Sequence, residues 1–215
     1  FTIPAGQTWA IQGLVETDGS VINRGTLEMR PGAHLRFINV NEAAFVGGPE
    51  PDPPPSMFLS DIGLWTLDTG RLDIQGTPKL PWGRVNNHAT WLDTDELRLC
   101  PYRKGDYGAG GFPLFARGAV LPDVEMAGAL VLPDAVLNLT RNAKISGTSG
   151  GRAHIFIHNT VPTVHSVKYL ELEHMAPMRL DGNGNNIGVL GRYPFHFHHS
   201  GDNVRGSVIE GLVVK

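Results

Sequence analysis

The sequence has almost no cysteine, because Cys100 is the only one in 215 residues. A single thiol excludes an intrachain disulfide and a zinc cage built from cysteines. No apolar run approaches the roughly 20 residues that a membrane helix needs. The net charge of -3 offers no basic surface for nucleic acid. We therefore expect no membrane span and no nucleic-acid partner.

Long amphipathic helical patterns are also missing, whereas glycine and proline are frequent, with 27 and 16 residues. Such a composition is typical of a β-protein with many turns. No leader peptide is recognisable, and the chain opens with Phe1, which is typical of a processed or trimmed product. The composition fits a secreted or extracellular β-protein, and the missing leader says little about the compartment.

Short strand-like segments separated by glycines occupy residues 1–118, with a proline-rich stretch at 47–55 and a glycine-rich stretch at 102–113. From residue 119 the apolar alternation recurs roughly every 15 to 25 residues, the period of one coil in a parallel β-helix. We therefore predict an all-β chain with a Gly-rich β domain at 1–118 and parallel β-helix coils at 119–215. The second part is expected to be truncated at its C-terminal end.

A β-sandwich is the alternative all-β fold. It would space its strands more closely, at roughly 8 to 12 residues, and join them through tight hairpins. The one candidate turn, Asp181-Gly182, lies in the polar loop 181–186. This loop is long for a hairpin turn, so the sequence favours the β-helix.

The residues best suited to catalysis or metal binding are concentrated between residues 191 and 202. His196 and His198 alternate with two phenylalanines, and successive side chains of a strand point to opposite faces. If the phenylalanines face a core, both imidazoles project from the outer face, roughly 6–7 Å apart. Arg192 and Asp202 flank this pair with opposite charges. A solvated polar face is the plainer interpretation.

Two other segments alternate in the same way. Inward isoleucines at 155 and 157 place His154 and His158 outward, and inward leucines at 170 and 172 place Glu171 and Glu173 outward. If the three strands are neighbours in one sheet, histidines and glutamates form a ladder. The ladder can hold a divalent cation, with zinc favoured over calcium because imidazole suits zinc. It can equally form an acid/base pair or a salt-bridged solvent face.

Histidine 174 joins this ladder only if the strand bends after Glu173. The remaining isolated histidines are expected to be ordinary surface or loop residues: His34, His88 and His165.

Several of these segments resemble the cell-migration-inducing and transmembrane hyaluronan-degrading proteins and their bacterial relatives. The first 100 residues resemble the Gly-rich domain that precedes the β-helix in that family. The specific part is the Arg-Tyr-Pro-x-His-Phe-His pattern. The matching segments are Gly25–Met29, Gly76–Trp82, Leu139–Gly147, His154–Ile157, Leu170–Met175 and Gly191–His198. The resemblance implies a right-handed parallel β-helix, pectate-lyase-like in architecture, that acts on or binds extracellular polysaccharide.

Two departures from that family stand out. Its members continue for several coils beyond the Gly-Asp that matches Gly201-Asp202, whereas this sequence stops at Lys215. Either a missing segment or a second chain is expected to cap the C-terminal coil, because an open coil exposes unpaired strand edges. The loop 181–186 is an insertion, which either shapes a substrate groove or is a tolerated surface loop.

The favoured hypothesis is an extracellular enzyme that degrades a hyaluronan-like or other anionic polysaccharide. Arg192 would neutralise a uronate carboxylate, and His196 or His198 would act as acid or base. Asp202 or Glu173 would orient that histidine or bind metal, and the expected metal ligands are His196, His198, His154, His158 and Glu173.

The choice between lyase and hydrolase stays open, since Glu171 and Glu173 approach the spacing of a hydrolase carboxylate pair. A non-catalytic glycan-binding solenoid and a structural, filament-forming β-solenoid module are the alternatives to an enzyme.

Overall fold

The computed structural model describes residues 1–45, 61–78, 141–180 and 182–215, and the backbone of four strands between residues 82 and 138. The chain forms two compact units: Phe1–Thr77 with Asn142–Lys215, and Pro78–Arg141. In the described residues the only helices are two short 3-10 turns, η1 (Glu42–Ala44) and η4 (Gly201–Val204). The predicted all-β class with almost no helix is confirmed.

The first unit is built from three sheets of five parallel strands. We name them sheets A, B and C. Sheet A contains β1 (Thr2–Ile3), β4 (Val21–Asn23), β7 (Leu64–Leu67), β14 (Ile155–His158) and β19 (His196–Phe197). Sheet B contains β2 (Thr8–Ile11), β5 (Thr26–Met29), β8 (Arg71–Gln75), β15 (Ser166–Lys168) and β20 (Val208–Glu210). Sheet C contains β3 (Leu14–Thr17), β6 (His34–Phe37), β13 (Ala143–Ser146), β16 (Leu170–Glu173) and β21 (Val213–Val214).

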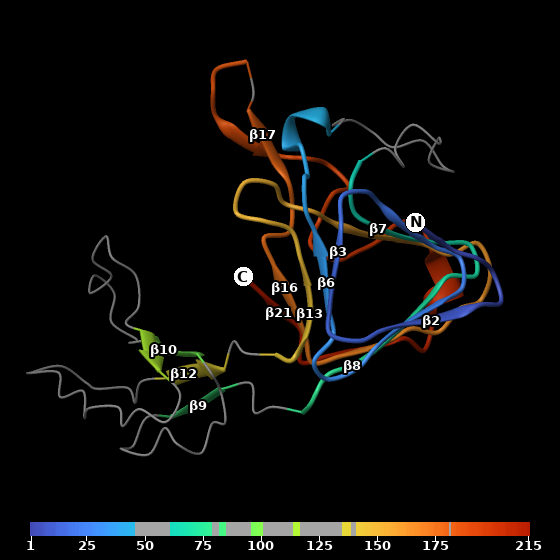
Figure 1. Ribbon diagram of the computed structural model, residues 1–215, viewed down its shortest axis with the longest axis horizontal. Coiled ribbons are helices and arrows are strands. Elements are labelled where there is room, and N and C mark those ends of the chain that lie inside the picture. The colour runs from blue at the N-terminus through green and yellow to red at the C-terminus, as the bar shows by residue number, and fades with distance from the viewer. Residues whose placement is uncertain are drawn as a thin grey trace, which may run out of the picture. The chain divides into compact units, whose positions relative to one another are not determined.

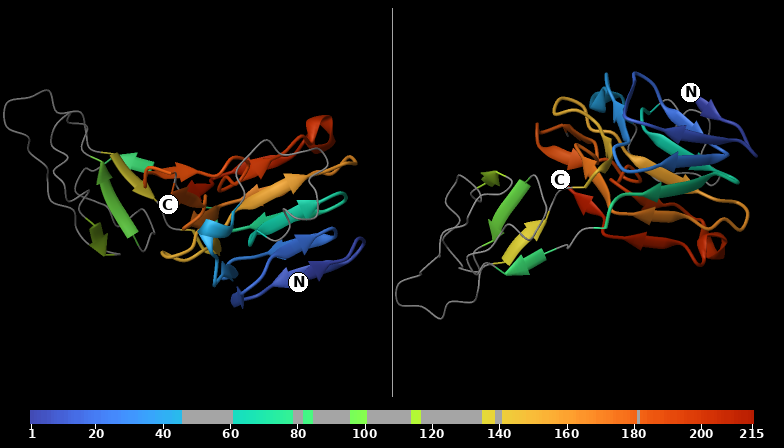
Figure 2. Two further views of the ribbon diagram at one scale, coloured as in Figure 1. Left: turned by 90° about the horizontal axis from the view of Figure 1, so that it is seen from above. Right: turned by 60° about the horizontal axis from the view of Figure 1, so that its bottom comes forward.

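The chain visits sheets A, B and C in turn, and each strand pairs with the strand one coil later. Figure 1 shows the three sheets of this unit as the sides of a triangle, and Figure 2 shows the coils stacked from blue to red. Alternate residues point into the triangle, where Ile155, Ile157, Leu170 and Leu172 are completely buried. These inward positions are the predicted ones, and the stacking fits a β-solenoid.

The division of the chain differs from the expected boundary at residues 118–119, which itself lies outside the described residues. Strands from before residue 78 and from after residue 141 pair in all three sheets. The N-terminal segments are therefore coils of the same solenoid, not a domain that precedes it. The expected proline-rich and glycine-rich stretches at 47–55 and 102–113 also lie outside the described residues.

The second unit, residues 78–141, is inserted in the sequence between β8 and β13. Its described strands form an antiparallel sheet in the order β11-β10-β12-β9. Their bounds are β9 (Trp82–Arg84), β10 (Glu96–Cys100), β11 (Leu114–Ala116) and β12 (Ala135–Asn138). In the described part of the chain, no helix has the length and apolarity to cross a membrane.

Two connections from sheet C to sheet A carry further additions to the coil. One of them contains η1, and the other forms a hairpin in which β17 (Met178–Leu180) pairs antiparallel with β18 (Asn186–Gly188). The sequence argument against a hairpin at the loop 181–186 was therefore wrong. The turn is long, but the flanking residues still pair.

Candidate functional site

The outer face of sheet A gathers four of the predicted site histidines. Strands β14 and β19 are neighbours, with Phe156 opposite His196. The ring centroids of His196 and His198 are 5.3 Å apart, and those of His158 and His198 are 5.8 Å apart. His154 precedes β14 and lies close enough to His196 for their charges to interact. The prediction that alternation places these imidazoles on one face is confirmed.

This face is packed rather than solvated. Trp65 and Phe156 lie side by side on it, with ring centroids 4.8 Å apart, and both are completely buried. His154 is also completely buried, with its ring edge-on to Trp65 at 4.9 Å. Strands β7 and β14 are buried on both faces because they carry large apolar side chains outward as well as inward. A solvated outer face is therefore excluded here.

A buried ion pair covers these aromatic rings. Arg192 Nε lies 2.9 Å from Asp61 Oδ2, and the two side chains are only 1% and 2% exposed. The guanidinium carbon of Arg192 lies 5.0 Å from the Trp65 ring centroid and 5.7 Å from that of Phe156. Arg192 is thus near the histidines, as predicted, but its carboxylate partner comes from the chain itself. Sequence reasoning did not single out Asp61, which is distant in the chain and in an unremarkable turn.

Glu171 and Glu173 do not join the histidines, contrary to the expected ladder. Both lie on β16 in sheet C, where Lys144 pairs with each of them. The hydrogen bond from Lys144 is the main cause that lowers the pKa of Glu173, and burial opposes it. Between β14 and β16 the chain turns two corners of the triangle, so outward side chains of these strands point away from different sheets.

Asp202 is also outside the cluster. It lies in η4, its side chain is 86% exposed, and its Oδ1 accepts a hydrogen bond of 2.7 Å from Arg205. The expectation that Asp202 bonds an imidazole was wrong. A short 3-10 turn after β19 pairs this carboxylate with the cation three residues later instead.

Hydrogen bonds to carbonyls assign the protons on two of the imidazoles. His196 Nδ1 lies 3.0 Å from Gly191 O, and His158 Nδ1 lies 3.0 Å from His198 O. A carbonyl only accepts, so each Nδ1 carries a proton and each neutral ring keeps a lone pair on Nε2. His196 is partly exposed, and its Nε2 is therefore the accessible base of the cluster.

His154 differs from His158 and His196 in the surroundings of its ring nitrogens. Neither ring nitrogen makes a hydrogen bond. Burial, followed by the charges of Arg192 and His196, lowers its pKa well below 6.5, and the Asp61 backbone only weakly opposes this. His154 is therefore a neutral packing residue beside the ion pair.

The expected metal set is incomplete in the described residues. Among them, no group of three or more His, Cys, Asp or Glu side chains is arranged to hold a metal ion. Zinc usually takes about four ligands. The imidazoles of His196 and His198 lie together, but Glu173 is paired with Lys144 in another sheet, so the five expected ligands are not all brought together.

A cleft of about 890 Å³ opens beside the cluster. Among the described residues its lining contains the side chains of Arg152, Arg192, Lys215 and His174 but none of an Asp or Glu. His174, expected to join the histidines only if the strand bends, has φ 51° and lines this cleft instead. Tyr193 connects the cleft to the histidines, because it is 44% exposed and its ring lies 4.9 Å from the His196 ring. Tyr193 belongs to the Arg-Tyr-Pro-x-His-Phe-His pattern, and no role for it was predicted from the sequence.

The isolated histidines also differ from expectation. His165 is completely buried: its Nδ1 accepts from Leu72 N–H at 3.1 Å, and its Nε2 donates to Asn159 Oδ1 at 2.9 Å. His34 is partly buried and lies 2.8 Å from Ser146 Oγ. His88 lies outside the described residues.

Comparisons with family models, with curated proteins and with solved structures gave no match to this chain.

Proposed function

We propose that this chain is a secreted, right-handed parallel β-helix that binds and cleaves an anionic, uronate-containing polysaccharide such as hyaluronan. The observation that carries the proposal is the connection between the corner cleft and His196. Tyr193 lines the cleft and touches the His196 ring. A tyrosine ring offers an apolar face on which a sugar can stack.

The charge of the cleft supports an acidic polymer. In the part of the chain that the structure describes, the charged residues of its lining are Arg152, Arg192 and Lys215, and all three are cations. Each has a carboxylate nearby, from Glu42, Asp61 and Glu171 respectively. An arginine has five N–H donors, more than the bonds of Arg152 to Glu42 and Met178 use. Arg152 is therefore favoured over the buried Arg192 for binding a uronate carboxylate.

Among cleavage mechanisms, a lyase fits better than a hydrolase. A hydrolase needs a carboxylic acid with a raised pKa as its proton donor. The pKa of Glu173 is lowered by Lys144, and Glu171 contacts the same lysine. A lyase needs instead a base that removes the proton next to the uronate carboxylate, and the lone pair on His196 Nε2 supplies one.

In this reaction His196 Nε2 takes the proton from the carbon that bears the carboxylate. The electrons of that C–H bond form a carbon–carbon double bond, and the bond to the glycosidic oxygen on the adjacent carbon breaks. The departing oxygen takes up a proton from the imidazolium or from water. Arg152 would stabilise the charge that develops on the carboxylate.

The test is a product assay on hyaluronan, with dextran as a neutral polymer. A lyase produces both new reducing ends and ultraviolet absorbance from the unsaturated uronate, whereas a hydrolase produces reducing ends alone. His196→Gln should lower the rate by roughly 10²- to 10⁴-fold, the usual contribution of a general base. His34→Gln, which changes a histidine on sheet C, should retain the activity. Absence of product from the wild-type chain would overturn the enzymatic proposal.

The second candidate is a glycan-binding solenoid without catalysis. It is favoured by one observation: neither Glu173 nor Asp202 is available to orient His196, since each pairs with a cation elsewhere. Binding of hyaluronan without any product, and with equal affinity in His196→Gln, would support this candidate.

A further inference from the structure

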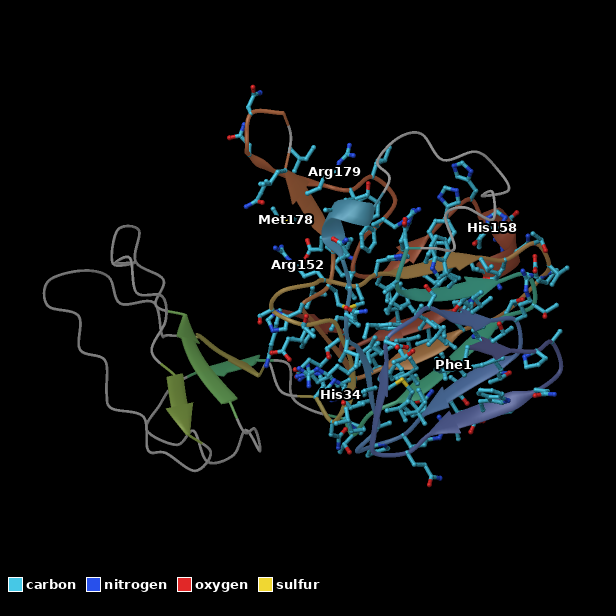
Figure 3. All side chains as sticks on the ribbon, turned by 45° about the horizontal axis from the view of Figure 1, so that its top comes forward. Phe1, His34, Arg152, His158, Met178 and Arg179 are labelled. Carbon is cyan, nitrogen blue, oxygen red and sulfur yellow. The ribbon has the colours of Figure 1, made fainter. Side chains whose placement is uncertain are left out.

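One carboxylate joins three separate connections at the corner between sheets C and A. Glu42, in η1, accepts hydrogen bonds at Oε1 from the Arg152 backbone N–H, at 2.7 Å, and from Arg152 Nε, at 3.2 Å. Its Oε2 accepts from the Met178 N–H at 2.5 Å. Figure 3 shows Arg152 and Met178 beside one another next to η1. Glu42 therefore links η1, the segment before β14 and the start of β17.

Much of the hairpin formed by β17 and β18 is exposed. Leu180 is 65% exposed, Ile187 is 36% exposed, and all three residues of β18 are exposed. An isolated two-stranded hairpin is marginal in water. The chain also approaches the hairpin through two non-glycine residues in the left-handed region, His174 at φ 51° and Ala176 at φ 68°. Such backbone is kept only where its surroundings hold it.

The residues that Glu42 holds are also residues of the cleft. Arg152, Met178 and Gly188 line the cleft, whereas Glu42 is not among its described lining residues. The bonds of Glu42 to both Arg152 and Met178 set the position of the cationic side chain relative to the hairpin. Arg152 Nη1 in turn lies 2.8 Å from Met178 Sδ, so Glu42, Arg152 and Met178 all contact one another.

We propose that Glu42 is a positioning residue that holds the β17–β18 hairpin and Arg152 as one wall of the cleft, and so sets the affinity for the anionic polymer. The inference rests on the proposed function for the identity of that polymer, but not for the clamp itself. Loss of Glu42 should release the hairpin, move Arg152 and weaken binding. The His196 base should be unaffected.

The test compares Glu42→Ala and the isosteric Glu42→Gln with Glu16→Gln. Glu16 pairs with Arg36 at 3.1 Å on sheet C, with both side chains 42% exposed, so it is a carboxylate that binds no hairpin. Amide hydrogen exchange should become roughly tenfold faster or more in the peptide 178–188 of the Glu42 variants, and stay unchanged in Glu16→Gln. The kcat/KM for hyaluronan should fall about tenfold, because a displaced Arg152 binds the uronate carboxylate and stabilises its developing charge less well, or the Kd should rise about tenfold if the chain only binds.

Each outcome decides a different claim. Unchanged exchange at 178–188 overturns the clamp. Faster exchange with unchanged affinity overturns the claim that the clamp sets binding. If both Glu42 variants lose the far-UV spectrum, Glu42 supports the whole fold and the local clamp is wrong. If the wild-type chain does not bind hyaluronan, the proposed function fails, while the exchange data still decide the clamp.

Discussion

The chemistry of each histidine in this chain depends on what its two ring nitrogens face. His196 donates from Nδ1 to a carbonyl and is partly exposed, so it can act as a base. His165 accepts at Nδ1 from a backbone N–H, so it must be neutral for that bond to exist. His154 is neutral because it is buried near Arg192. Residue type alone does not separate a base from two packing residues.

Acid should destabilise the chain through His165. Burial, with a smaller effect from Arg71, lowers the pKa of His165 from 6.5 to about 4. In this pH window the unfolded chain binds a proton that the folded chain does not. The free energy of unfolding therefore falls as the pH drops from 6.5 towards 4, by on the order of 3 kcal/mol in total. The lowered pKa of His154 acts in the same direction.

Urea unfolding between about pH 7 and pH 4.5 measures this dependence. His165→Gln removes the titrating ring, so the variant should show a flatter dependence of stability on pH, even if it is less stable at neutral pH. Equal slopes for the variant and the wild-type chain would contradict the assignment to His165.

At the residue scale the sequence could predict which side chains point outward, but not what covers them. The alternation around Ile155 and Phe195 identified the outward histidines correctly. It carried no information on Asp61, which is more than a hundred residues away from Arg192 in the sequence. The burial of the outer face depends on that distant partner. The burial of His154 and Arg192 therefore could not be predicted from the sequence.

At the scale of elements, strands β7 and β14 of sheet A are packed on both faces, and a small residue makes this possible. Gly63 precedes β7 and lies against His154. A Cβ at Gly63 would meet His154 Nε2 and the His154 carbonyl oxygen, each at 2.7 Å. The backbone oxygen cannot move aside without disturbing the pairing of β7 with β14.

Gly63→Ala should therefore lower the free energy of unfolding by about 1–3 kcal/mol, the usual cost of overpacking. Gly19→Ala is the matched control, because a Cβ there meets nothing within 4 Å and should change stability by less than about 0.5 kcal/mol. Equal effects of the two substitutions in urea unfolding would show that His154 is not packed against β7.

The ion pair on the same face gives a second prediction. Asp61→Ala removes the carboxylate that balances the buried charge of Arg192, and should cost roughly 3–5 kcal/mol. The double variant Asp61→Ala, Arg192→Met replaces the charge with an apolar chain over Trp65 and should regain much of that loss. If the effects of the two single changes simply add, as measured by a double-mutant cycle, the pair is not coupled as described.

The corners between strands explain why the condition for the ladder, three neighbouring strands in one sheet, is not met. Tyr169 separates β15 from β16 with φ 54°, and in the next coil Gly211 separates β20 from β21 with φ 63°. One residue at the first corner and two at the second thus turn the chain from sheet B to sheet C. The short strand β15 (Ser166–Lys168) was not predicted, so nothing indicated that a strand of sheet B lies between β14 and β16.

At the scale of the molecule, the solenoid is continuous in space but divided in the sequence. The inward alternation of Leu27 and Met29, or of Leu35 and Phe37, is the same as that of the later coils. The regular period was recognised only after residue 119, because 78–141 separates β8 from β13 of one coil. Sequence periodicity finds coils of similar length, and a long insertion hides the first part of the series.

The two ends of this insertion meet, which leads to the last prediction. Thr77 N–H donates to Asn142 Oδ1 at 2.8 Å, and Asn142 Nδ2 donates to Thr77 Oγ1 at 2.7 Å. Both residues belong to the solenoid unit, and a turn of a few residues can bridge such adjacent ends. Replacing residues 79–140 by a short Gly-Ser linker should leave the far-UV β spectrum and a cooperative urea transition. A matched variant with Asn142→Ala in the shortened chain should be less stable, since it removes both bonds that close the coil. An unfolded or aggregated shortened chain would show that the solenoid depends on unit 78–141.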